Sequence, residues 1–170
     1  KMRWQPSLQI IPHYESEPLY IKALKNSLEK KISELNWKPD AIVASYHGIP
    51  KKYFDKGDPY HCYCQKTTRL LSEQFKKIPI KTTFQSRFGP QEWLKPYTDK
   101  TLESLPVEGK KNVLVICPGF SSDCVETLEE ISMQGKESFI QNGGTNFDVV
   151  PCLNDNDDHI NLLQHLAKKY

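Results

Sequence analysis

The 170-residue sequence lacks several features that would place it in particular classes of protein. It has no apolar run near the roughly 18 residues of a membrane-spanning helix, and no secretory leader is visible at its start. The net charge is only +2, which implies no strong attraction to nucleic acid or to a membrane surface. Glycine-rich phosphate loops, nucleophile elbows and nucleic-acid motifs are also absent. Neither a membrane-spanning protein nor a nucleic-acid-binding protein is therefore expected.

The sequence has only five cysteines without a regular spacing, and this argues against two common uses. The sequence contains Cys62, Cys64, Cys117, Cys124 and Cys152. An odd number without a spacing framework argues against a disulfide scaffold and favours a reducing compartment. Cys62 and Cys64 are two apart on a predicted helix, so they do not face each other, and no second pair has zinc-type spacing. Structural or incidental roles are expected for both.

What the sequence does have is an alternation of apolar strands and amphipathic helices. Hydrophobic residues make up 38% and charged residues 26%, as in an ordinary globular domain. Strands are predicted at 8–11, 41–45, 81–85, 112–117 and 147–150, with helices at about 17–35, 58–76, 99–105, 123–142 and 155–166. This order predicts a single α/β domain over residues 1–170. Its parallel sheet should have about four or five strands with helices on both faces, as in flavodoxin-like and Rossmann-like folds.

The stretch after the strand at 112–117 carries the strongest chemical signal. Asp123, followed three residues later by Glu126, has the form of a capping box and predicts a helix start. At about 100° per residue, Asp123, Glu126 and Glu130 share one face of that helix. The other side, expected to pack on the sheet, carries Cys124, Val125, Leu128 and Ile131. Three carboxylates would then lie at the carboxyl ends of the strands, where ligands bind in parallel sheets.

These acids also have a plainer interpretation, in which two of them cap the helix and Glu130 is a solvated charge. His47 favours the chemical interpretation, because it follows the strand at 41–45 and should lie on the same rim. An imidazole that faces carboxylates can bind a divalent metal or accept a proton near neutral pH.

Aromatic residues follow the strand at 81–85, namely Phe88, Trp93 and Tyr97. They are either anchors of the core or, if exposed in a cleft, a flat surface for a flat apolar ligand. Together with the histidine and the carboxylates, they suggest metal chemistry on a large aromatic substrate.

Seven segments resemble the ferrochelatase family, bacterial in type. They are SYHGIP (45–50), GDPY (57–60), FQSRFGP (84–90), WLKPYT (93–98), PGF (118–120), DCVETLEE (123–130) and PCLN (151–154). The segments follow family order and cover about residues 8 to 165. The family fold has two similar α/β halves, and the chain matches only the second, C-terminal half. The opening residues 1–6 are not typical of a natural start, which also favours a piece of a longer protein.

The resemblance implies an enzyme, a lyase of haem and porphyrin biosynthesis that inserts ferrous iron into protoporphyrin IX to form protohaem. It implies that His47 and Glu126 are catalytic, can ligate the metal and face each other across the porphyrin. Trp93 would lie near the porphyrin, and Asp123 and Glu130 would continue a carboxylate line, so these three are expected to bind substrate. Part of the helix is widened to π geometry in some members.

The resemblance also bears on partners and cofactors. A porphyrin and ferrous iron are the expected substrates, and no further cofactor is expected. Some members hold an iron–sulfur cluster through cysteines, but Cys62 and Cys64 lack the further partner spacing. The missing partner is the N-terminal half of the same protein, without which this chain should fold but not turn over. The expected location is cytoplasmic, with peripheral contact at the inner membrane left open.

Three alternatives stay open. A related chelatase would insert another metal, such as cobalt, into another tetrapyrrole, and a tetrapyrrole carrier would bind the ring without metallating it. A flavodoxin-like binding module would need a phosphate-binding loop after its first strand, and residues 13–17 form a poor one.

Overall fold

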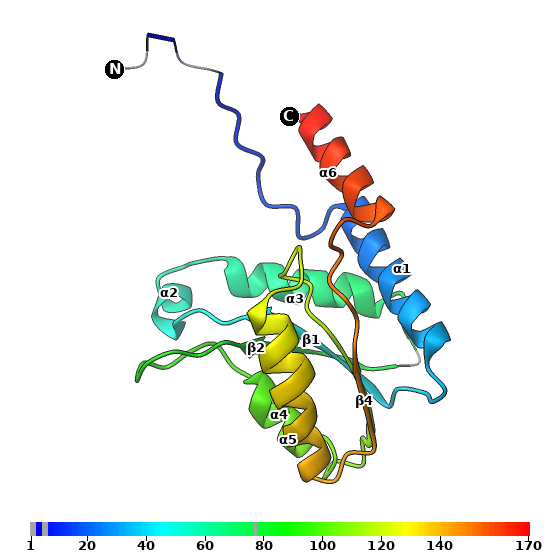
Figure 1. Cartoon of the computed structure of the whole chain (residues 1–170). Helices are drawn as coiled ribbons and strands as arrows, with labels where there is room; N and C mark the ends of the chain where they lie inside the picture. The colour runs from blue at the N-terminus through cyan, green and yellow to red at the C-terminus, as the bar shows by residue number, and fades with distance from the viewer. Residues whose placement is uncertain (1–2, 5–6, 77) are drawn as a thin grey trace.

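A four-stranded parallel sheet organises the computed structural model, which describes residues 3–4, 7–76 and 78–170 (Figure 1). The strands are β1 (Ala41–His47), β2 (Ile80–Gln85), β3 (Asn112–Ile116) and β4 (Asn146–Val149). Their spatial order is β2-β1-β3-β4, and every neighbouring pair is parallel. The predicted α/β fold with a parallel sheet is confirmed.

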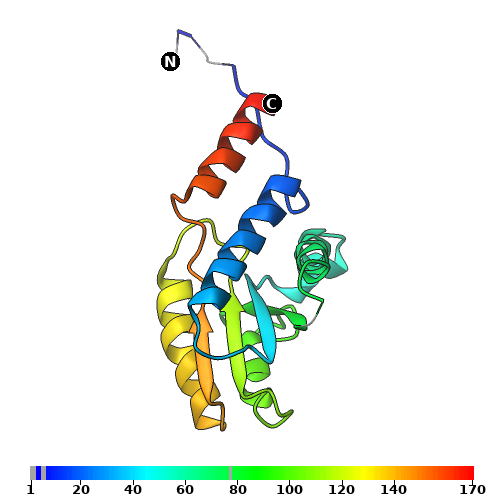
Figure 2. The same ribbon diagram turned by 90° about the vertical axis from the view of Figure 1, so that its right-hand side faces the viewer.

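Helices cover both faces of this sheet, as Figure 2 shows from the side. One layer contains α1 (Pro18–Glu34), α3 (Tyr60–Ser72) and α6 (Asp157–Lys169). The other contains α4 (Thr98–Ser104), the π-helix η1 (Glu126–Gly135) and α5 (Lys136–Gln141). A short helix, α2 (Lys51–Asp55), follows β1.

Both faces of the central strands β1 and β3 are buried, and alternate residues enter two separate cores. Ile42 and Leu114 pack in the core beneath α1, α3 and α6. Val43 and Val113 pack in the core beneath α4, η1 and α5, where Phe139 is fully buried. Strands buried on both faces have no polar side, so they appear in the sequence as continuous apolar runs.

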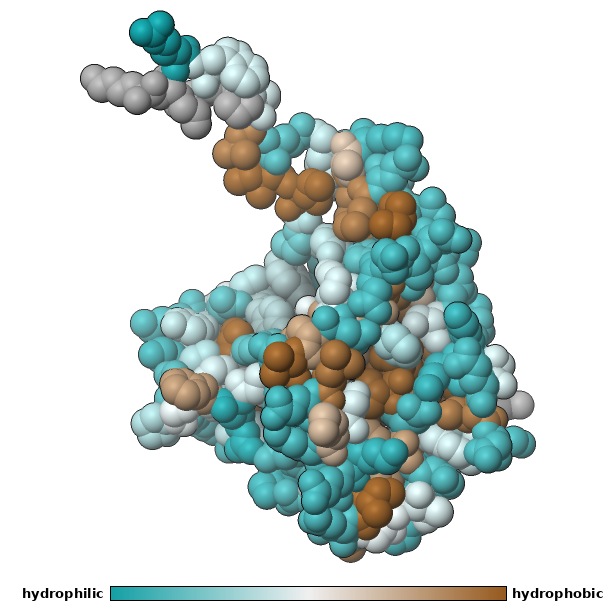
Figure 3. Space-filling view, in the orientation of Figure 1, coloured by the Kyte–Doolittle hydropathy of each residue, from teal (hydrophilic) through white to brown (hydrophobic). Residues whose placement is uncertain are grey.

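The strand predicted at residues 8–11 does not form. Leu8 and Ile10 are 84% and 80% exposed, in an apolar segment that stands away from the sheet (Figures 1 and 3). A strand needs a neighbouring strand to satisfy its backbone groups, and none of the four described strands pairs with this segment. For the described residues this prediction is wrong.

The helix after β3 also differs from its prediction. The π-helix η1 begins at Glu126, its N-cap residue Val125 makes no side-chain cap bond, and the predicted capping box at Asp123 is wrong. Val125 and Leu128 were expected to pack on the sheet but are 68% and 54% exposed. The buried residues of η1 are Thr127, Ile131 and Gly135. The prediction assumed about 3.6 residues per turn. A π-helix has wider turns, so a different set of side chains faces the sheet.

Two smaller differences concern the segment after β1. Residues 51–55 form α2 although a loop was predicted, and α3 ends at Ser72 rather than near Lys76. Among the helices of the described residues, none combines the length and the apolar composition that crossing a bilayer requires.

Candidate active site

The carboxyl ends of β1, β2 and β3 meet at one edge of the sheet, because the strands are parallel. His47 is the last residue of β1 and lies beside Gln85, the last residue of β2. The side-chain amide of Gln85 donates a hydrogen bond of 2.8 Å to the backbone oxygen of Glu126, so the start of η1 reaches the same edge. The structure therefore brings His47 and Glu126 to one rim.

The His47 ring is held by the carbonyl of the next residue. Its Nδ1 atom lies 2.7 Å from the Gly48 oxygen. A carbonyl oxygen can only accept, so Nδ1 carries the hydrogen in this contact. In the neutral ring the lone pair is then on Nε2, and no described side chain is hydrogen-bonded to that atom. Nε2 of this half-buried residue can accept a proton or ligate a metal.

Glu126 is the first residue of η1 and lies at the same rim. The pKa of its carboxyl is lowered from the usual value, first by a hydrogen bond with Cys124 and then by a hydrogen bond from its own backbone; the positive charge of His47, when that ring is protonated, lowers it further. The carboxylate is thus ionised at neutral pH. An ionised carboxylate beside an imidazole can pass a proton or share a cation.

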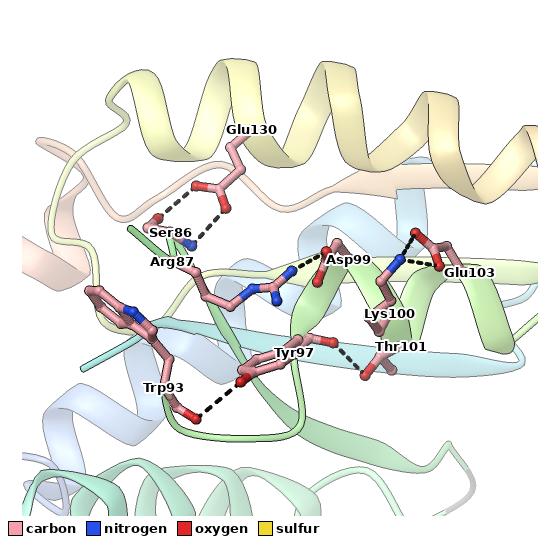
Figure 4. A network of polar contacts seen from close by, with 9 residues as sticks. All are labelled: Ser86, Arg87, Trp93, Tyr97, Asp99, Lys100, Thr101, Glu103 and Glu130. Carbon is pink, nitrogen blue, oxygen red and sulfur yellow. Dashed lines mark hydrogen bonds and ion pairs between the residues drawn. The ribbon is translucent and has the colours of Figure 1, made fainter. Parts of the chain in front are cut away.

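Glu130 is tied to the end of β2, as Figure 4 shows. Its Oε1 accepts from the Ser86 N–H at 2.7 Å, and its Oε2 accepts from the Ser86 hydroxyl at 2.6 Å. Ser86 has φ 63°, in the left-handed region that non-glycine residues seldom adopt. The two bonds stabilise that conformation and join the β2–α4 connection to η1. Both oxygens of the Glu130 carboxylate are therefore already engaged by Ser86.

A buried polar chain lies beneath these acids. Gln85 is almost fully buried, and its Oε1 accepts from the Ser45 hydroxyl at 2.7 Å. Ser45 in turn lies 2.8 Å from the Thr98 hydroxyl of α4. The sequence interpretation missed these partners of the site. A signal was available, because polar residues in strands buried on both faces must find internal hydrogen-bond partners.

The Asp123 carboxylate is engaged by hydrogen bonds within the chain. Its Oδ2 accepts from the Asn154 amide at 2.8 Å, and its Oδ1 accepts from the Cys152 N–H and the Thr127 hydroxyl, each at 3.2 Å. Burial would raise the pKa of Asp123, but these bonds outweigh it and the pKa is lowered. Asp123 therefore links the start of η1 to the loop after β4.

Trp93 does not form an exposed wall. It is 9% exposed, its indole N–H donates to the Phe88 oxygen at 3.0 Å, and its backbone pairs with Pro50. Its own carbonyl oxygen accepts from the Tyr97 hydroxyl (Figure 4). The exposed aromatic residue of this segment is Phe88, at 84%. Tyr97 is half-buried, with the Arg87 guanidinium 3.9 Å from its ring centroid.

The described residues do not form a complete metal site. No group of three or more histidine, cysteine, aspartate or glutamate side chains within residues 3–4, 7–76 and 78–170 is placed to hold a metal ion. Of the predicted acids, Asp123 and Glu130 are engaged by hydrogen bonds with Asn154 and Ser86, whereas the pKa of Glu126 responds to the charge of a protonated His47. Any metal ion that meets this pair must take its remaining ligands from other molecules or from other parts of the protein.

Comparisons with known proteins agree with the resemblance in the sequence. The sequence model of the ferrochelatase family matches residues 1–170. A ferrochelatase of Rhizobium meliloti is 54% identical over an alignment of 171 positions, which covers 99% of this chain and 50% of that protein. Ferrochelatases of Allorhizobium ampelinum and Brucella anthropi are 53% and 48% identical over 99% of this chain, covering 50% and 49% of those proteins. The chain spans about half the length of the curated relatives it matches.

Proposed function

Because the chain belongs to the ferrochelatase family, we propose that it forms one half of an enzyme that inserts ferrous iron into protoporphyrin IX to form protohaem. The observation that carries the proposal is the state of His47. Its Nδ1–H donates to the Gly48 oxygen, and no described side chain is hydrogen-bonded to its Nε2 atom. Glu126 is close enough for its pKa to respond to the charge of a protonated His47.

The chemistry of the reaction matches this pair. Iron insertion must remove two pyrrole protons, strip water from the ferrous ion and bend the ring so that its nitrogen lone pairs are exposed. In our proposal the His47 Nε2 accepts a proton or ligates the arriving iron, and the Glu126 carboxylate accepts a proton and passes it to solvent. The four pyrrole nitrogens supply the ligands that two side chains cannot.

Asp123 and Glu130 stay predicted substrate-binding residues, with a condition that their contacts impose. Both carboxylates are engaged inside the chain, Asp123 with Asn154 and Glu130 with Ser86. Transfer of protons or metal from Glu126 toward Glu130 would require the Ser86 contacts to open. Glu126 is therefore the acid that we assign to the reaction itself.

We further propose that the other half of the same protein supplies the opposite wall of the porphyrin site. A flat ring clasped between two walls can be held in a strained conformation and shielded from water, which one wall alone does not achieve. Five free cysteines among the described residues favour a reducing, cytoplasmic location, with peripheral membrane contact left to experiment.

The test is an anaerobic iron-insertion assay of the full-length protein with His47→Ala and Glu126→Gln. Each substitution should reduce turnover by roughly two to four orders of magnitude, as expected for a positioned acid–base group. His47→Ala should also flatten the dependence of the rate on pH between about 5 and 8, where imidazole titrates.

Glu129→Gln is the matched control, because Glu129 lies on the same π-helix with an exposed side chain. It should keep near-normal turnover. Near-normal turnover in Glu126→Gln would instead mean that Glu126 has only a structural role at the start of η1. A shifted porphyrin Soret band without metallation by the wild-type protein would identify a tetrapyrrole carrier.

A further inference from the structure

We propose that Trp93 is a positioning residue for His47 and acts through the carbonyl group of Gly48. The inference rests on the proposed function, in which the His47 Nε2 meets a proton or the iron. It changes the expectation for Trp93, since the buried indole would set the state of the histidine rather than form a wall for the porphyrin.

The first step concerns the ring of His47. The Gly48 oxygen, 2.7 Å from Nδ1, fixes the hydrogen on that nitrogen and leaves Nε2 as the reactive atom. Functional histidines are commonly oriented in this way by a carbonyl on the second ring nitrogen. The direction of one peptide carbonyl, between Gly48 and Ile49, therefore decides which nitrogen faces the rim.

The second step concerns what holds that peptide. On one side, the Gly48 N–H donates to the Gln85 oxygen at 2.8 Å. On the other, the Leu94 N–H donates to the Ile49 oxygen at 3.0 Å, within the short antiparallel pairing of Pro50 and Trp93. The backbone is thus fixed on both sides of the Gly48 carbonyl.

The third step concerns the indole itself. A Cβ atom on Gly48 would lie 3.2 Å from the Trp93 ring and 2.8 Å from the Gln85 oxygen, so the Gly48 backbone is wedged between the two. The indole is held in turn by its N–H bond to the Phe88 oxygen. With the ring removed, the peptide after Gly48 could rotate into the vacated space and release Nδ1.

A buried indole also has little surface to offer a substrate. Trp93 is 9% exposed, whereas Phe88, five residues earlier, is 84% exposed. On this segment Phe88 can contact a flat ligand, whereas Trp93 packs against Gly48, the residue after His47. The two aromatic residues therefore have separable roles.

The test measures the His47 tautomer by NMR in the full-length protein with ring-¹⁵N-labelled histidine, assigned with His47→Ala. The wild-type ring should be mainly in the Nδ1–H form. Trp93→Leu and Gly48→Ala should both raise the Nε2–H fraction, and Trp93→Phe, which keeps a ring against Gly48, should restore most of the wild-type ratio. Trp93→Met, whose unbranched side chain adapts better to an irregular space, gives the same readout if Trp93→Leu does not fold.

Kinetics give the second readout. Trp93→Leu should lower kcat by about ten- to a hundredfold, as for loss of a group that orients a functional histidine, with little change in the porphyrin KM. Trp37→Leu is the control for loss of a partly buried indole far from the rim, and it should leave the His47 tautomer unchanged.

An unchanged His47 tautomer in Trp93→Leu would overturn the inference, and so would a defect expressed only as a raised porphyrin KM. The tautomer measurement does not depend on turnover. It therefore decides the role of Trp93 even if His47→Ala keeps its activity and the proposed function fails.

Discussion

At the residue scale, the hydrogen bonds of Asp123 give it a measurable part in stability. Its carboxylate accepts from Asn154, Cys152 and Thr127. In Asp123→Asn, the new amide group would point a donor at the Asn154 amide, so at least one bond is lost. We expect a loss of about 1 kcal/mol in the free energy of unfolding, because the site is partly exposed and screened. Urea denaturation at pH 7 measures it.

The same residue predicts a dependence of stability on pH. The pKa of Asp123 in the folded protein lies below its usual value of 3.8. Its stabilising contribution is therefore complete above that value and is lost as the pH falls below it, through the folded pKa. Asp123→Asn should remove this part of the acid sensitivity. Asp155→Asn, at an exposed position in the next loop, is the control and should change neither quantity.

At the scale of single elements, α3 sets the expectation for its two cysteines. Cys62 is exposed and Cys64 is buried, so the two thiols point to different sides of the helix. Burial raises the pKa of Cys64 to about 12, whereas a metal ligand must be a thiolate. We predict that Cys62→Ser and Cys64→Ser in the full-length protein keep iron insertion. An iron–sulfur absorption band that disappears in either variant would contradict this.

The strands were predictable from the sequence because of where they lie. The central strands β1 and β3 are buried on both faces, so their apolar runs are unmistakable. Parallel pairing then places the ends of neighbouring strands together, and this alone was enough to expect His47 and Glu126 at one rim.

The contacts that shape the site were not predictable, because they join residues distant in the chain. The π-helix η1 is held by Gln85 and Ser86, about 40 positions before Glu126 and Glu130. An amphipathic pattern at 3.6 residues per turn carries no sign of such a contact. The same holds for the segment 8–11, whose apolar residues indicate a strand only where a partner strand exists.

At the scale of the whole molecule, both hydrophobic cores are well buried, but several large apolar side chains are exposed on the surface. The two core clusters include many fully buried side chains, such as Leu28 and Phe139. In contrast, Leu8 and Ile10 are exposed on the N-terminal segment, and Ile160 and Leu163 are about half exposed on α6. Where exposed apolar side chains form a contiguous patch, they commonly mark an interaction site.

The chain spans about half the length of the relatives it matches, and our proposal takes the other half of the same protein as its partner. We predict that the chain alone unfolds cooperatively in urea, because both cores are contained within it, and that it inserts no measurable iron. His47 and Glu126 are present, but a porphyrin resting on one open wall keeps its water and its planar shape. Adding the other half as a separate polypeptide should restore part of the turnover, and the same mixture made with His47→Ala should not. Iron insertion by the chain alone at a rate within about tenfold of the full-length protein would mean that one wall is sufficient, and that the rim of this sheet strains and metallates the ring without a clasp.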